Sequence, residues 1–219
     1  MIRKKRLNRL GTGLFTFISI FYVLPVVVVL FNSFKKKSYI NLEPFKLPNE
    51  TTFTGLDNYA TAINQYDFLK AVGWTVFITV GSVLVILICT SMCAWFITRV
   101  RTRVTKAIYI LCVFSMVVPF QMVMFTLSLV TDRLGLGTPW GLIIIYLGFG
   151  AGLAVFMFCG FVKSIPIEIE EAAMIDGCSP IRTFFSVVLP IMKPTYISVG
   201  ILETMWIWND FLLPYLTLD

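Results

Sequence analysis

The chain has 219 residues, of which 58% are hydrophobic and 14% are charged, and its mean hydropathy is +0.85. Soluble globular domains are about 25% charged and about 45–50% apolar, so this composition indicates a membrane protein. The sequence has no His, which excludes His-containing zinc sites and Ser-His-Asp triads, and it has no P-loop pattern. We therefore expect no catalytic residue, no metal site and no cofactor site in this chain.

Long uncharged runs are the main structural feature, because a helix needs about 20 apolar residues to cross the hydrocarbon core. Four such runs carry no charge, and a fifth carries only Glu203 and Asp210. The sequence therefore predicts an all-α membrane protein, a polytopic helical bundle with five spans at 11–33, 71–98, 107–130, 140–162 and 195–217.

The first span follows a basic N-terminus, residues 1–10, which resembles the start of a signal peptide. Its apolar stretch is longer than the usual run of about 7–15 residues, and no A-x-A cleavage pattern follows it. We expect an uncleaved anchor. The next segment, 34–70, is polar and too short for a domain with its own core, so it is either a docking surface or a connecting loop.

The basic residues predict the orientation. Twelve Lys and Arg residues lie on the same predicted side as the N-terminus and six on the other, which by the positive-inside rule places the N-terminus in the cytoplasm. The basic link RVRTRVTK, which begins at Arg99, joins the second and third spans on that side. A short basic link between spans fits the topology and anionic lipid headgroups, so we expect membrane lipid and no nucleic acid as a partner.

A polar interruption at 164–194 separates the fourth and fifth spans. Its first half has acids near a helix start and Gly177 at the stop, and its second half begins with Ser179 and Pro180 and is expected to end at Pro190. Ten helical residues extend only about 15 Å, about half of the hydrocarbon core, so this part does not span. The residue pattern leaves open whether it docks on a partner or packs on its own bundle.

The same stretch resembles a known family. Glu171-Ala172-Ala173, Gly177, Val187 and Leu189-Pro190 have the spacing of the EAA loop, EAA-x3-G-x9-I-x-LP, in permease subunits of binding-protein-dependent ABC importers, with Val in place of the usual Ile. VVPFQ (117–121), LGLGTPWGLIIIYLG (134–148), GFVKSIP (160–166) and WNDFLLP (208–214) are similar to the carbohydrate-uptake branch that includes the second maltose-system permease.

The resemblance implies an ABC importer type-1 transmembrane core over 71–219 with a cytoplasmic coupling loop at 164–194. The implied partners are a second permease subunit forming a heterodimer, two ATP-binding subunits that carry ATP-Mg, and an extracytoplasmic sugar-binding protein in a bacterial inner membrane. The residues that would contact the ATPase are Glu171, Ala172, Ala173, Asp176, Gly177, Leu189 and Pro190. Family members usually carry a sixth span, so the sequence leads us to expect a truncated form.

Polar residues within the spans are candidates for the translocation path, because a charge at the bilayer centre costs about 2.5–3.5 kcal/mol on insertion scales. Glu203 is the central candidate, and Gln121, Asn209 and Asp210 are further ones. Gly148 and Gly152 form a small-xxx-small pattern, which predicts close helix packing. The alternative function is a self-sufficient secondary transporter or channel, for which only Glu203 and Asp210 offer charged sites within the spans.

Overall fold

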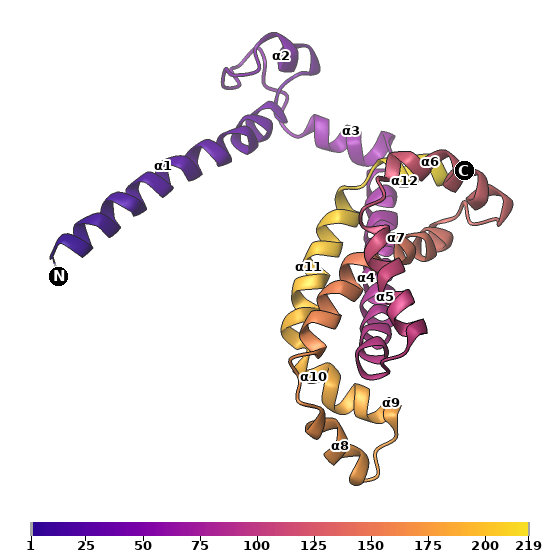
Figure 1. Ribbon diagram of the computed structural model, residues 1–219. Coiled ribbons are helices and arrows are strands. Elements are labelled where there is room, and N and C mark those ends of the chain that lie inside the picture. The colour runs from indigo at the N-terminus through magenta and orange to yellow at the C-terminus, as the bar shows by residue number, and fades with distance from the viewer. Residues whose placement is uncertain (1, 219) are drawn as a thin grey trace. The chain divides into compact units, whose positions relative to one another are not determined.

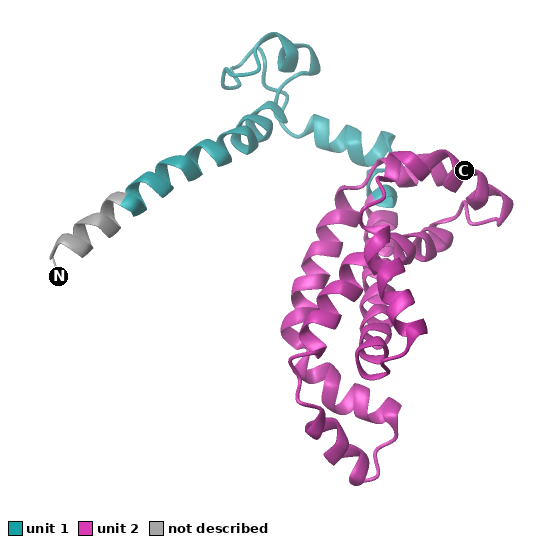
Figure 2. Ribbon diagram, in the orientation of Figure 1, with its two compact units in different colours: residues 1–71 teal, residues 72–219 magenta. Residues whose placement is uncertain are grey.

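The computed structural model describes the backbone of residues 2–218 and the side chains of residues 11–218. Within that range every regular element is a helix, and the β-type pairing is one isolated bridge between Lys35 and Phe53. The prediction of an all-α chain is confirmed. The chain divides into two compact units, residues 1–71 and 72–219, which we describe separately (Figure 2).

The first unit contains α1 (Ile2–Asn32), α2 (Lys37–Leu42) and α3 (Asp57–Gln65). The stretch Gly11–Asn32 of α1 is long and apolar enough to cross a membrane. The segment after α1 is held by polar contacts: buried Lys35 donates from Nζ to the Glu43 carbonyl at 2.8 Å, and Asn58 donates from Nδ2 to the Lys35 carbonyl at 2.7 Å. Hydrogen bonds rather than an apolar core therefore order this segment.

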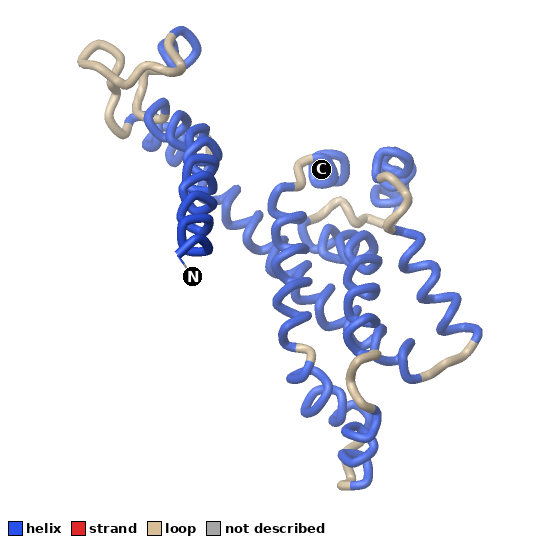
Figure 3. The backbone as a smooth tube through the Cα atoms, turned by 60° about the vertical axis from the view of Figure 1, so that its left-hand side comes forward, coloured by secondary structure: helices blue, strands red, loops and turns tan. Residues whose placement is uncertain are grey.

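The second unit is built on α4 (Phe68–Arg99), most of which belongs to it, and on α5 (Arg103–Ser115), α7 (Pro139–Val162) and α11 (Lys193–Asn209), which lie side by side in Figures 1 and 3. Local chemistry sets two of the starts. The Thr102 side chain closes a capping box with Thr105, and Thr138 accepts from the Gly141 amide with Pro139 at the first helical position. The core includes Ile86, Leu142, Tyr146, Phe158 and Val199.

The predicted third span, 107–130, is wrong as a single helix. The chain forms α5 and then α6 (Phe120–Arg133), which are bent by 106° relative to each other. Pro119 lies at the N-cap of α6 in an extended conformation. Proline has no N–H for the preceding turn and keeps the residue before it out of the helical region, so α5 ends before Pro119 and a new helix begins after it.

The predicted fifth span, 195–217, is also wrong as a single helix. It divides into α11 and α12 (Leu212–Thr217), with Asp210 between them in an extended conformation. The Asp210 carboxylate accepts from the Leu212 and Leu213 amides at 3.1 and 3.3 Å. These bonds satisfy amides that the start of α12 would otherwise leave unpaired, and a charged cap favours a new helix over continuation of the old one.

Three helices are individually long and apolar enough to span a membrane: Gly11–Asn32 in α1, then α4 and α7. The number rises to as many as five if each bent pair, α5 with α6 and Pro180–Ile191 with α11, is one span. At one end of the second unit α6 packs on α12, where Ser128 donates to the Leu216 carbonyl at 2.9 Å.

Close packing on α7 uses a different pair of glycines from the one predicted. A methyl group on Gly148 would meet no atom within 4 Å, so Gly148 is not at a helix contact. A methyl group on Gly152 would lie 2.7 Å from the Cys112 carbonyl oxygen of α5, and one on Gly150 would lie 2.9 Å from Glu203 Oε2 of α11. Two residues two positions apart thus face two different neighbours.

We predict opposite effects of alanine at two of these positions. Gly152→Ala should lower the melting temperature of the detergent-solubilised protein, because the added methyl group forces α5 away from α7, and overpacking costs about 1–3 kcal/mol. Gly148→Ala is the matched control and should leave stability unchanged or raise it, since alanine favours the helix over glycine. Equal melting temperatures for the two variants would contradict the packing described here.

Candidate functional site

The coupling hairpin, as we call residues 164–192, lies at one end of the second unit (Figure 1). It contains α8 (Ile167–Ile175), α9 (Pro180–Thr183), the π-helix η1 (Phe184–Val188) and α10 (Leu189–Ile191). Ser179 caps α9 by accepting from the Arg182 amide, and Pro180 holds the first helical position. The predicted pair of short helices, with Gly177 between them, is therefore confirmed.

Gly177 makes the turn between the two halves. Its φ is +86°, a conformation that glycine adopts freely and other residues adopt at a cost. The Gly177 amide donates to the Met174 carbonyl at 3.0 Å and the Cys178 amide to the Ala173 carbonyl at 3.0 Å. This pair of bonds is a Schellman motif, which satisfies carbonyls at the end of α8 and fixes the direction in which the chain leaves it.

We expected the second helix to end at Pro190, but it continues past this residue. The helical stretch runs from Pro180 to Ile191, and the 78° bend to α11 comes after it, at Met192. The π-helix before Pro190 is the physical reason, because Pro190 has no N–H and its ring crowds the carbonyl four residues earlier, and a wider turn relieves that conflict.

The apolar side chains of this helix fall into a buried set and an exposed set. Phe184 and Val188 are buried, and the Phe184 ring lies 5.4 Å from the Trp95 ring of α4. Ile181 and Phe185 remain exposed. The hairpin thus packs one side against its own bundle, which is one of the two alternatives left open by the sequence, and leaves apolar side chains exposed on the other side.

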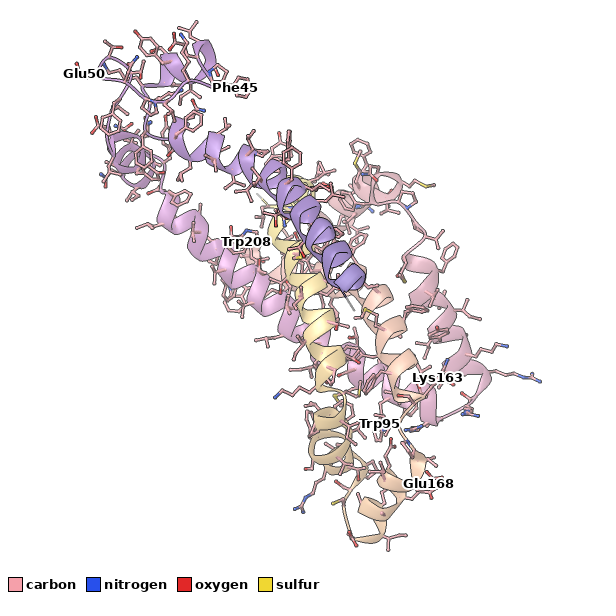
Figure 4. All side chains as sticks on the ribbon, turned by 90° about the vertical axis from the view of Figure 1, so that its left-hand side faces the viewer. Phe45, Glu50, Trp95, Lys163, Glu168 and Trp208 are labelled. Atoms are coloured by element: carbon pink, nitrogen blue, oxygen red, sulfur yellow. The ribbon has the colours of Figure 1, made fainter. Side chains whose placement is uncertain are left out.

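A buried ion pair attaches α8 to the end of α4. Glu170 is 2% exposed and accepts from Arg99 Nη2 at 2.7 Å, while the Trp95 indole donates to its other carboxylate oxygen at 2.9 Å. Arg99 Nη2 also donates to the Ile165 carbonyl at 3.0 Å. Trp95 lies near the end of the unit that carries Glu168 of α8 (Figure 4). Charge-assisted bonds of this kind are strong and geometrically specific.

Glu171, one residue further on, is in the opposite situation. It is exposed, and within residues 2–218 it has no ion pair or side-chain hydrogen bond. The exposed surface of the hairpin also includes Ala172, Asp176, Gly177 and Pro190, while Ala173 and Leu189 are half-buried. Ile175 beside them is 85% exposed. Five of the seven predicted ATPase-contact residues therefore lie in α8 or at the turn that follows it, and the other two, Leu189 and Pro190, lie in α10 at the far end of the hairpin.

The sequence analysis missed Arg99 and Trp95. Their spacing of four residues puts both on one face of the last turns of α4, and this spacing is the one signal in the sequence that could have identified them. Their partner Glu170 is 71 positions away from Arg99, and nothing local to either segment joins them.

Removing one member of this ion pair should destabilise the protein. We predict that Glu170→Gln lowers stability by about 3–5 kcal/mol, because it leaves the guanidinium of Arg99 in a largely buried position without its counter-charge. Thermal unfolding of the solubilised protein measures the effect. Glu168→Gln, in the same helix but exposed, is the control and should change the melting temperature little. Equal shifts for the two variants would refute the assignment.

Glu203, the central pathway candidate, is buried in α11. It is 1% exposed, and neither carboxylate oxygen has a hydrogen-bond partner among the described residues. It lines a cavity of about 240 Å³ together with Met116, Phe149, Gly150, Leu153, Leu202 and Trp206. A buried carboxyl group without a partner is costly and is common at functional positions in membrane proteins.

The other pathway candidates lie apart from this cavity. Gln121 is exposed in the first turn of α6, and exposed Asn209 donates to the Met205 carbonyl at 2.6 Å. Asp210 caps α12 and accepts from the Tyr146 hydroxyl at 3.1 Å. The contacts of Asp210 therefore give it a structural role at the junction of two helices.

The described part of the chain has no group of three His, Cys, Asp or Glu side chains that could hold a metal ion. The sequence-predicted candidates thus lead to two groups of residues, the free face of the coupling hairpin and the cavity around Glu203.

Comparisons with known proteins connect these features to a family. The family described as "Binding-protein-dependent transport system inner membrane component" matches residues 86–219. The chain is 39% identical over 218 residues to the probable starch degradation products transport system permease protein AmyC of Thermoanaerobacterium thermosulfurigenes, which covers 100% of this chain and 77% of that protein.

Two further similarities agree with this match. The multiple sugar-binding transport system permease protein MsmG of Streptococcus mutans is 35% identical, over 91% of this chain and 72% of that protein. Among solved structures, a bacterial ABC transporter involved in the import of the acidic polysaccharide alginate aligns with a TM-score of 0.78 at 20% identity, over 98% of this chain and 75% of the other. The fold is that of an ABC importer transmembrane subunit.

Proposed function

Since the chain belongs to the family of binding-protein-dependent transport system inner membrane components, we propose that it is the permease of an ATP-driven carbohydrate importer. The relatives named for starch degradation products and for multiple sugars support the substrate class. In this proposal the chain performs no chemistry. It forms half of the translocation path in a bacterial inner membrane, with its N-terminus in the cytoplasm.

The proposed assembly contains a second permease subunit, two ATP-binding subunits and an extracytoplasmic sugar-binding protein. ATP and Mg²⁺ bind to the ATP-binding subunits, where hydrolysis takes place. This chain must then receive a mechanical displacement from them, and the coupling hairpin is the element suited to receive it.

The observation that carries the proposal is the contrast between two neighbouring carboxylates in α8. Glu170 is buried and paired with Arg99, whereas Glu171 is exposed and has no partner within residues 2–218. An exposed acid next to the small side chain of Ala172 and the apolar side chain of Ile175 suits a cleft that supplies a basic group and an apolar wall. We assign Glu171 the contact with the ATPase.

Glu170 then has a different part in the same mechanism. Displacement of α8 pulls on the Arg99 guanidinium and the Trp95 indole, both of which belong to α4. Because α4 continues as one helix of 32 residues from Phe68 to Arg99, motion at this end is carried through the length of the span. We propose this ion pair as the connection through which hydrolysis moves the second unit.

The alternative of a self-sufficient secondary transporter or channel has less support. Such a protein would need coupling-ion sites within its spans, and of its two candidates Asp210 already caps α12. ATP-independent uptake by this chain alone would nevertheless overturn the proposal.

Charge reversal at the docking face tests the assignment of Glu171. We predict that Glu171→Lys abolishes co-purification with the ATP-binding subunits in detergent, because it places a cation against a basic site. Asp132→Lys, which makes the same charge change at an exposed position in α6, should leave the complex intact. Survival of the complex in the Glu171→Lys variant would remove the basis for the docking face.

Proteoliposomes of the assembled complex test the function directly. The sugar-binding protein and the labelled sugar are added on one side of the vesicle membrane and ATP on the side of the ATP-binding subunits. We expect uptake of at least one sugar from a panel of starch-derived and other oligosaccharides. No uptake should occur without ATP.

Glu203 is proposed to face the translocation path through the cavity that it lines. We predict that Glu203→Leu raises the melting temperature, since it removes a buried carboxyl group with no described partner, while sugar uptake per ATP hydrolysed falls. Glu203→Gln keeps the size and the hydrogen-bonding capacity of the side chain, so it separates the effect of the carboxyl group's charge on uptake from the effect of its shape. Unchanged uptake in both variants would limit Glu203 to a structural contact.

A further inference from the structure

A basic cleft lies at the same end of the second unit as the coupling hairpin. Its volume is about 380 Å³, which is within the range of about 300–1,000 Å³ typical of ligand sites. It is formed where α4 ends, α5 begins and α7 ends, and its lining includes the three cations Arg101, Lys106 and Lys163.

These cations have no counter-charge in the described residues. None of these three cations belongs to a salt bridge. Glu170 of the hairpin is already paired with Arg99. The Lys163 ammonium lies over the Tyr109 ring at 5.7 Å. Three convergent cations without an acid favour an anionic ligand.

The threonine hydroxyls of the cleft already have hydrogen-bond partners, so the groups that can bind an anionic ligand are the three cations. The Thr98 hydroxyl donates to the Ala94 carbonyl at 2.7 Å, and the Thr105 hydroxyl donates to the Val100 carbonyl at 2.6 Å. Thr102 accepts from the Thr105 amide as a helix cap. The cleft therefore presents cationic donors beside hydroxyl groups that already have partners.

An apolar groove of about 620 Å³ adjoins the cleft and shares Tyr109 and Lys163 with it. Its walls include Phe156, Met157 and Phe161 of α7 and Pro194 of α11. Its two serine hydroxyls have local partners, since Ser164 donates to the Phe161 carbonyl at 2.7 Å and Ser198 to the Pro194 carbonyl at 3.1 Å. A cationic cleft that continues into an apolar groove is complementary to an anionic phospholipid, which has a negative headgroup and apolar acyl chains.

We propose that this cleft and groove together bind one anionic phospholipid. The headgroup phosphate is held among Arg101, Lys106 and Lys163, and an acyl chain lies along α7 past Phe156 and Gly160. Basic pockets between transmembrane helices at the cytoplasmic side are suited to anionic headgroups, and each cation near the surface contributes about a fivefold factor in affinity. The site connects the lipid to the end of α4 that carries Arg99.

The test measures retained lipid on the full transporter complex, reconstituted in nanodiscs of phosphatidylcholine with a minor fraction of phosphatidylglycerol. After extraction, native mass spectrometry counts the phosphatidylglycerol that stays bound. Arg101→Gln with Lys163→Gln should reduce its affinity roughly 25-fold. Arg103→Gln with Arg133→Gln makes the same charge change at exposed residues outside the cleft and should retain the lipid.

A second variant tests the acyl chain and keeps all charges. A methyl group on Gly160 would meet no atom within 4 Å, so a side chain at this position starts into open space. Gly160→Leu places a larger apolar side chain in the groove and should also release phosphatidylglycerol. Equal retention in the cation variant and its control would overturn the proposal. So would retention in Gly160→Leu together with displacement of the lipid by inorganic phosphate, which would indicate a free-anion site. Loss of the second permease subunit in Gly160→Leu would assign the groove to a protein interface and overturn the proposal as well.

Discussion

The ion pair between Arg99 and Glu170 is the constraint on which the functional end of the molecule depends. It is the only salt bridge among the described residues in which both partners are largely removed from solvent, with side chains 16% and 2% exposed. The Trp95 indole and the Ile165 carbonyl complete its hydrogen bonding. A buried pair is tolerated only when its bonds are satisfied in this way, and such a pair fixes geometry more than it adds stability.

That constraint gives two adjacent glutamates two different environments. With Glu170 turned inward, helical geometry turns Glu171 about one hundred degrees away from it, toward solvent. The Schellman motif at Gly177 and the buried Phe184 then hold the second half of the hairpin against the bundle. The hairpin is thus packed on α4 and is not a loose loop, and this packing is what the proposed transmission of a displacement requires.

The breaks in the bundle show where sequence analysis was sufficient and where it was not. The spans at 71–98 and 140–162 are close to α4 and α7, because long uncharged runs and the Thr138-Pro139 start are local properties. A proline such as Pro119 disturbs a helix, but the sequence does not show whether the helix kinks there or breaks with a bend of 106°, because the two outcomes differ in how the following residues pack. α6 lies on α12, and that contact between distant segments decides between them.

The candidate site divides in the same way. The turn at Gly177, the cap at Ser179 and the acids at the start of α8 follow from backbone conformations and capping chemistry that a few neighbouring residues determine. The π-helix at Phe184–Val188 does not, since a proline can be accommodated by ending the helix or by widening it. Burial of Phe184 against Trp95 favours the second outcome.

By itself, the sequence determined that the chain is helical and where its apolar runs lie, because both depend on composition, period and length. Only the tertiary structure decided that Glu170 is buried and Glu171 free, that Gly150 and Gly152 rather than Gly148 carry the close contacts, and that three cations share one cleft. Neighbouring residues on a helix point in different directions, and which direction is inside is set by the helix that packs there.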